Sequence, residues 1–240
     1  NVPLTFSSAM SLTLVPAIST SFAIKNMESI RHKTELGIRT MLLISLPCAV
    51  GLSIYSQPIF DLLFPSAHNG GAILRYLAYS VVFIMVGNIL QSVLQALDKF
   101  RIPVFNLFIA LIVKFVLNYI LMAIPSINIY GMVISNIGAF AVTSILNYIA
   151  IKRTVNIQIN VSQTIIKPLI ASGIMGAFGV YIYNLFSNFL PNSINVLIAI
   201  VLCVIVYFTV LVLIKGITKG ELALMPGGKK IIDRFGRMIK

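Results

Sequence analysis

A single lysine, Lys114, lies near the middle of the apolar stretch Pro103–Pro125. In a helix with a rise of about 1.5 Å per residue, its Cα is about 16 Å from either membrane face, beyond the reach of a lysine side chain. A cation at that depth costs about 2.5 to 3.5 kcal/mol on insertion scales, so it faces protein or water and marks a pathway or binding site by default. Asn118, one helical turn further on, is its nearest candidate partner. The alternative is a structural pair with a carboxylate outside this chain.

Uncharged polar residues recur at helical spacing in two other apolar stretches. Asn88, Gln91 and Gln95 are spaced i, i+3 and i+7, which places them on one helical face. Buried amides of this kind either hydrogen-bond between membrane helices, for about 1 kcal/mol each, or line a cavity. Arg75, near the outer end of its span, is more simply an interfacial anchor than a ligand. The candidate substrate-binding residues are Lys114, Asn118, Asn88, Gln91, Gln95 and Arg75. The second polar stripe consists of Asn136, Thr143 and Asn147.

Groups suited to enzyme catalysis are missing from the predicted membrane interior. The six acidic residues all fall in loops, at span ends or in the tail: Glu28, Glu35, Asp61, Asp98, Glu221 and Asp233. The sequence shows no carboxylate pair, no Ser/His/Asp set and no glycine-rich phosphate loop, and its two histidines are isolated. We therefore expect no catalytic residues, no metal site and no cofactor, and the pattern favours transport over catalysis.

The composition is that of a polytopic membrane protein. Hydrophobic residues make up 58% of the chain and charged residues 10%, with a mean hydropathy of +0.98, whereas soluble domains carry about 25% charged residues. Seven stretches have the roughly 20 apolar residues that cross the hydrocarbon core. These predicted spans are residues 2–23, 40–60, 72–97, 103–124, 129–151, 168–188 and 194–214.

The net charge of +12 follows membrane topology, which argues against a nucleic-acid partner. If the chain crosses seven times, the loops on one side and the C-terminal tail together carry all the lysines and arginines except Arg75 and Lys114. By the positive-inside rule, the chain begins outside and ends in the cytoplasm. Residues 25–39 are expected to form a surface helix between two spans. Residues 215–240 are expected to form a basic amphipathic tail on the anionic inner leaflet.

Several phrases resemble a known transporter family. LVPAIS (14–19), SLPCAVGL (45–52), PIFDLLF (58–64) and QSVLQA (91–96) look like the C-terminal half of the polysaccharide-exporter flippases of the MOP superfamily. Within that superfamily, the stage V sporulation protein B group, related to the MurJ-type lipid II flippases, is the most similar. The sequence departs from many relatives at Leu97-Asp98, where they carry a glycine in the turn, and this departure affects only loop geometry.

The resemblance implies an all-α bundle equivalent to helices eight to fourteen of a fourteen-helix, two-lobe transporter like the MATE proteins. Residues 1–151 would then form a partial C-terminal lobe and 152–167 a cytoplasmic connection. Residues 168–214 would form an added helix pair, associated in the family with a groove for the lipid tail, and 215–240 the tail. The chain is expected to be the C-terminal part of a longer protein.

The implied function is a flippase of the bacterial cytoplasmic membrane that moves a polyprenyl-pyrophosphate-linked glycan or peptidoglycan precursor by alternating access. Its partners would be that substrate, membrane lipids and the missing N-terminal lobe. One alternative is a MATE-type drug or cation antiporter, which membrane carboxylates would favour. Another is a non-transporting scaffold for cell-wall or spore-envelope enzymes, recruited through the basic tail.

Overall fold

The computed structural model describes residues 2–64, 70–186 and 191–217, and over these ranges the chain is all-α. Seven helical segments of the described chain are long and apolar enough to cross a membrane, which confirms the predicted fold class. The helices are α1 (Val2–Ala23), α2 (Met27–Ile54), α3 (Ser56–Leu63), α4 (Gly71–Leu77), α5 (Ser80–Ala96), α6 (Arg101–Met122), α7 (Ile129–Val155), the π-helical turn η1 (Ser162–Ile166), α8 (Lys167–Phe186) and α9 (Asn192–Leu213).

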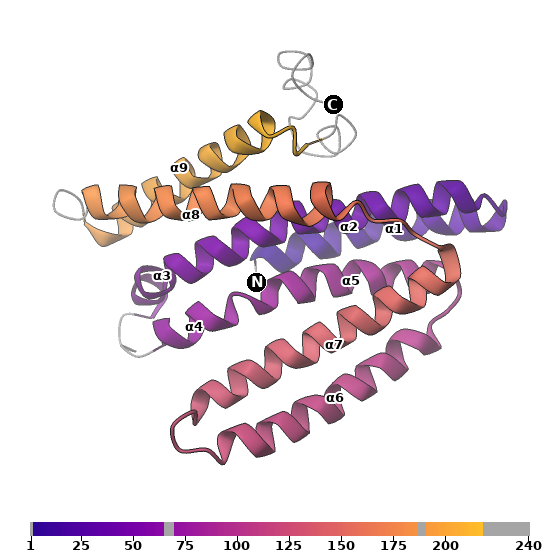
Figure 1. The fold of residues 1–240 in the computed structure, drawn as a ribbon, viewed down its shortest axis with the longest axis horizontal. Coiled ribbons are helices and arrows are strands. Elements are labelled where there is room, and N and C mark those ends of the chain that lie inside the picture. Colours follow the sequence, from indigo (N-terminus) through magenta and orange to yellow (C-terminus); the bar gives the residue numbers. More distant parts are fainter. Residues whose placement is uncertain (1, 65–69, 187–190, 218–240) are drawn as a thin grey trace.

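The long helices lie side by side, with the helix pairs α6–α7 and α8–α9 on opposite sides of α1, α2 and α5 (Figure 1). The α1–α2 and α5–α6 connections lie at one end, together with the end of α7, whereas α3, α4 and the α6–α7 turn lie at the other. Consecutive spans therefore run in opposite directions. We call the end that holds the α1–α2 turn the basic end, because most of the described lysines and arginines lie in the turns or helix ends there.

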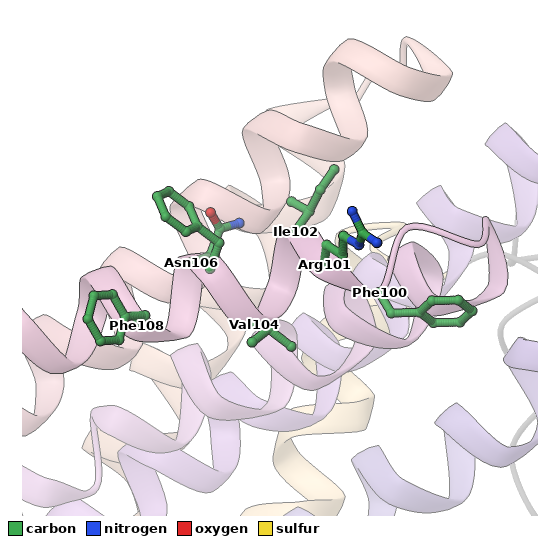
Figure 2. Close-up of a pocket in the computed structure, with 7 residues that line it drawn as sticks. Phe100, Arg101, Ile102, Val104, Asn106 and Phe108 are labelled. Carbon is green, nitrogen blue, oxygen red and sulfur yellow. The ribbon is translucent and has the colours of Figure 1, made fainter.

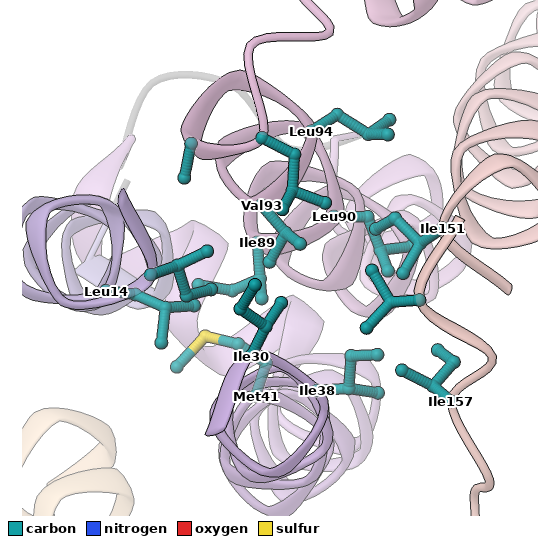
Figure 3. Close-up of a cluster of buried hydrophobic side chains, with 14 of the residues drawn as sticks. Leu14, Ile30, Ile38, Met41, Ile89, Leu90, Val93, Leu94, Ile151 and Ile157 are labelled. Atoms are coloured by element: carbon teal, nitrogen blue, oxygen red, sulfur yellow. The ribbon is translucent and has the colours of Figure 1, made fainter. Parts of the chain in front are cut away.

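The larger core cluster holds α1, α2, α5 and the end of α7 together (Figure 3). Ile30, Ile89 and Ile151 are each 0% exposed, and they come from three different helices. Ile157, in the connection after α7, belongs to the same cluster. Because lipid tails are as apolar as isoleucine, this packing stabilises the bundle through close van der Waals contact rather than through hydrophobic transfer.

A second core cluster joins α2 to the α8–α9 pair. Glycines on α8 permit the close approach, because a Cβ built on Gly176 lies 2.9 Å from a methyl of Val50, and one on Gly179 lies 2.7 Å from the sulfur of Cys203. Tyr207 of α9 donates its hydroxyl proton to the backbone carbonyl of Leu43, over 2.7 Å. Both partners of this bond are buried, so α9 is attached to α2 by a specific polar contact within the apolar interface.

Two predicted helix boundaries are wrong. The expected surface helix over residues 25–39 is not separate, since α2 runs from Met27 to Ile54 as one helix about 42 Å long. The third predicted span, residues 72–97, is present as Gly71–Ala96, with a break in the helix at Ala78 and Tyr79 between α4 and α5. The predicted span over residues 40–60 is also wrong at its end, because α2 stops at Ile54 and the short α3 follows.

The remaining spans agree with the prediction to within a few residues, and the predicted amphipathic tail lies outside the described residues from residue 218 onward. At the Leu97-Asp98 turn, where the resemblance implied a glycine, Asp98 adopts the left-handed conformation with φ 60°. Its backbone N–H donates to the carbonyl of Gln95, which closes the end of α5. Aspartate tolerates this conformation better than most residues, so the departure changes the turn residue and not the turn.

Basic side chains of α2 bind backbone carbonyls of neighbouring helices. Lys33 donates to the carbonyl of Ala17 near the end of α1, over 2.8 Å, and Arg31 donates to the carbonyl of Val155 at the end of α7, over 3.3 Å. Val155 belongs to the last turn of α7, whose carbonyls have no helical partner and give that end partial negative charge, whereas Ala17 lies six residues before the end of α1. Arg31 and Lys33 therefore help to hold α7 and α1 against α2.

Candidate functional site

The predicted amide stripe of α5 divides into two halves with different surroundings. Asn88 donates to the hydroxyl of Ser7 over 3.0 Å, and Ser92 donates to the hydroxyl of Ser11 over 2.8 Å, both across the α1–α5 interface. Ser7 and Ser92 are buried. These are hydrogen bonds between membrane helices, the first of the two predicted roles, and they fix α1 in register against α5.

Gln91 and Gln95 form the other half of the stripe and are exposed on the surface of α5. No hydrogen bond within the described residues engages either amide. On a helix at about 100° per residue, both lie within roughly 60° of Asn88, on the flank away from the buried Ile89 and Val93. Uncharged amides left facing outward at membrane depth are available to a polar ligand or to another part of the protein.

Lys114 and Asn118 lie on α6, both half-buried. Lys114 is one helical turn beyond the buried Ala110, at the edge of the face that packs on α7. Within the described chain no hydrogen bond or ion pair reaches the Lys114 amine, and the buried Oδ1 of Asn118 has no hydrogen-bond partner either. The predicted contact between the two residues is therefore absent from this conformation. Both side chains keep unused bonding capacity at membrane depth.

The candidate residues do not meet at one point. The helix α7 packs against both α5 and α6, whereas α5 and α6 scarcely touch, so Lys114 is separated from Gln91 and Gln95 by a helix. Arg75 is exposed in the last turn of α4, away from the other candidates. Within this chain the arrangement offers one cation with an amide on α6 and two amides on α5, as separate parts of a polar surface.

Sequence reasoning missed the polar contacts that lock helices in place. The amide of Asn106 donates to the side-chain oxygen of Asn147 over 2.8 Å, at the buried α6–α7 interface. Because Asn147 is buried and bonds Asn106 across the helix interface, it is a packing contact and does not line a cavity. One partner of the bond from Tyr207 to Leu43 could have been found from the sequence. Pro47 has no N–H, so the carbonyl of Leu43, four residues earlier, lacks its helical donor and needs another.

An open, apolar recess at the start of α6 contains none of the predicted site residues. It has a volume of about 790 Å³ and is lined by residues from the start of α6, including Phe100, Val104 and Phe108 (Figure 2). Arg101 is its one charged lining residue. The four described acidic residues are Glu28 and Glu35 in the basic-end portion of α2, Asp61 in α3 and Asp98 in the α5–α6 turn. Over the described ranges, no group of three or more metal-binding side chains occurs.

The fold is that of a multi-pass membrane protein in which several polar side chains at membrane depth have no partner in the described chain. The chain belongs to the lipid II flippase MurJ family, whose model matches residues 3–222. This match confirms the superfamily indicated by the sequence phrases.

Three curated relatives are similar along much of the chain. The lipid II flippase MurJ of Bacillus subtilis (strain 168) is 25% identical over 181 residues, which cover 73% of this chain and 33% of the relative. Stage V sporulation protein B of the same organism is 23% identical over 227 residues, 94% of this chain and 43% of the relative. The probable low-salt glycan biosynthesis flippase of Haloferax volcanii is 26% identical over 188 residues, 74% and 38% respectively. The chain thus matches between a third and just over two fifths of each relative's length.

Proposed function

We propose that this chain is the C-terminal part of a flippase that moves a polyprenyl-pyrophosphate-linked glycan or peptidoglycan precursor across the cytoplasmic membrane by alternating access. Family membership over residues 3–222 supports this function, as do relatives named as flippases for lipid II and for a glycan. In this proposal residues 1–151 form part of the C-terminal lobe and 152–167 the cytoplasmic connection. Residues 168–214 form the added pair, and 215–240 form the tail on the inner leaflet.

The observation that carries the proposal is the state of Lys114, a half-buried cation in a membrane span whose amine has no partner in the described chain. A pyrophosphate-linked sugar is anionic and polar, so its passage through hydrocarbon requires a hydrated cavity with cations. The amine of Lys114 supplies the positive charge for the pyrophosphate, and the amide of Asn118 supplies a donor beside it. A charge-assisted hydrogen bond of this kind contributes about 1.5 to 3 kcal/mol.

The exposed amides of α5 are assigned to the sugar. Gln91 and Gln95 each offer two donors and an acceptor to hydroxyl groups. Asn88 is assigned an indirect role, because its bond to Ser7 sets the position of α1 beside Gln91 and Gln95. Arg75, exposed near the outer end, is assigned to the membrane interface and to the departing head group.

The basic end is assigned to the cytoplasm, which places the C-terminus there as well. This follows from the positive-inside rule, because Lys25 and Lys99 lie in the connections at that end and Lys152 in the last turn of α7, while α3 and the start of α4 at the opposite end hold no lysine or arginine. The lipid-facing surfaces of α6 and α9 lie in a bacterial cytoplasmic membrane in this assignment.

The test measures flipping and abundance on the same samples of the full-length protein that carries this chain. Purified protein in liposomes is supplied with a fluorescent polyprenyl-pyrophosphate-linked glycan, and the labelled lipid that reaches the opposite leaflet is counted. Lys114→Met is expected to accumulate normally and to flip about ten- to a hundredfold more slowly, the change that 1.5 to 3 kcal/mol produces. Lys114→Arg keeps the charge and is expected to retain part of the activity.

Lys152→Met is the matched control, because it removes an exposed cation at the basic end, away from the membrane interior. It should flip as the unmodified protein does. If Lys114→Met accumulates poorly, the amine instead pairs with a carboxylate for structure. Normal abundance with normal flipping in Lys114→Met would contradict both roles.

A further inference from the structure

The connection between α7 and η1 lies flat against α2 instead of hanging free. Ile157 in this connection is 1% exposed and belongs to the core cluster shared by α1, α2 and α5. The backbone N–H of Gln158 donates to the carboxylate of Glu35 on α2 over 2.7 Å. Arg31, also on α2, holds the carbonyl of Val155 just before the connection starts. The buried anchor and the bonds to α2 hold this short segment in place and favour its moving together with α2.

Arg39 of α2 bonds at once to the turn before α8 and to the turn after α9. One terminal nitrogen, Nη1, donates to the side-chain oxygen of Gln163 in η1 over 3.1 Å, and the other, Nη2, donates to the carbonyl of Gly216, just after α9, over 3.0 Å. Lys167 donates to the carbonyl of Lys215 over 2.9 Å, so the start of α8 and the end of α9 are also joined to each other. The planar, two-pronged guanidinium suits this bridge, whereas the single amine of a lysine at position 39 could not reach both acceptors in the same way.

Further contacts along α2 hold the same pair. The bond from Tyr207 to the carbonyl of Leu43 follows one turn after Arg39. At the far end, the Tyr55 hydroxyl lies 3.4 Å from the sulfur of Cys203. The contact of α2 with the pair therefore extends from Arg39 to Tyr55 and is not confined to one hinge-like point.

We propose that Arg39 is a positioning residue that clamps the α8–α9 pair onto α2, so that the pair and the lobe move as one rigid body during transport. This proposal deepens the proposed function and rests on it only where flipping is measured. It means that the pair does not swing relative to α2 to open or close a path. Any alternating movement must take place elsewhere in the full-length protein.

A reversible disulfide tests whether the pair moves. The ideal Cβ of residue 176 lies 2.9 Å from a side-chain methyl of Val50, which is a suitable approach for a disulfide between Val50→Cys and Gly176→Cys. The variant is made in the full-length protein without its other cysteines. Cross-linking is expected to leave flipping at the rate of the reduced protein. If oxidation abolishes flipping and reduction restores it, relative movement of the pair is required and the rigid-body proposal is overturned.

Removal of the clamp provides the second test. In Arg39→Gln, the distance distribution between spin labels on α2 and α9 should broaden, and flipping should fall at normal abundance. The Val50–Gly176 disulfide should then restore flipping, which it would not do if Arg39 acted by contacting substrate. Arg153→Gln, which removes an exposed arginine at the same end, is the control and should change neither measurement.

The two readouts separate this proposal from the proposed function. An unchanged label distance in Arg39→Gln overturns the clamp whatever the protein transports. A protein that flips no lipid-linked glycan in any form overturns the proposed function, while the label distances still decide whether Arg39 holds the pair in place.

Discussion

Tyr207→Phe should destabilise the protein because it leaves a helix carbonyl without a donor. In α2 the carbonyl of Leu43 has no backbone partner at position 47, where proline lacks an N–H. The hydroxyl of Tyr207 donates to this carbonyl over 2.7 Å. Tyr207 is 3% exposed, so water cannot replace the hydroxyl as donor. The substitution removes one oxygen and leaves the ring in place.

The expected cost is about 1 to 2 kcal/mol. An unsatisfied buried acceptor costs about 1 to 3 kcal/mol in proteins generally, and measured hydrogen bonds between membrane helices lie at the lower end of such values, up to about 1.7. A change of this size alters the ratio of folded to unfolded protein by a factor of about 5 to 30. The measurement is equilibrium unfolding of the full-length protein in detergent micelles, followed by a label on α9.

A double-mutant cycle isolates the cause. Pro47→Ala restores an N–H that reaches the carbonyl of Leu43, so Tyr207→Phe should cost little in that background. The expected coupling is about 1 kcal/mol or more. If Tyr207→Phe costs the same with proline or alanine at position 47, the hydroxyl is not replacing the missing helical donor, and this reasoning fails.

Two other predictions separate packing from function and test the topology. Asn88→Ala should lower the free energy of unfolding by about 1 kcal/mol through its lost bond to α1, whereas Gln91→Ala should change it by less than about 0.5 kcal/mol and yet slow flipping. Equal stability losses for the two variants would contradict the division of the stripe. In a background without the native cysteines, an impermeant thiol reagent added outside intact cells should modify Ser193→Cys and spare Ser162→Cys, since both positions are exposed but lie at opposite ends of the bundle. The reverse labelling pattern would invert the assigned topology.

The membrane-spanning helices could be predicted from the sequence because hydrocarbon leaves the backbone few alternatives. A segment crossing hydrocarbon must satisfy its own backbone hydrogen bonds, so a run of about 20 apolar residues forms a helix whatever surrounds it. The span beginning at Arg101 illustrates this, since its mean hydropathy of 2.2 and its length sufficed to predict it. The predicted boundary at residue 40 was wrong, because nothing local ends a helix between Glu28 and Thr40. The extension of α2 is stabilised by contacts from Arg31, Lys33 and Glu35 to distant segments.

The sequence by itself determined the fold class, the number of spans, the family and the unusual cation at position 114, because each of these depends on residue type and on local spacing. Only the tertiary structure decided what each polar side chain does. Periodicity places Asn88 and Gln91 on one face of α5, and it cannot tell that Ser7 lies opposite the first while no described residue bonds the second. A hydrogen-bond partner 81 residues away is fixed by how helices pack against one another, and helix packing depends on side-chain shapes from several spans at once.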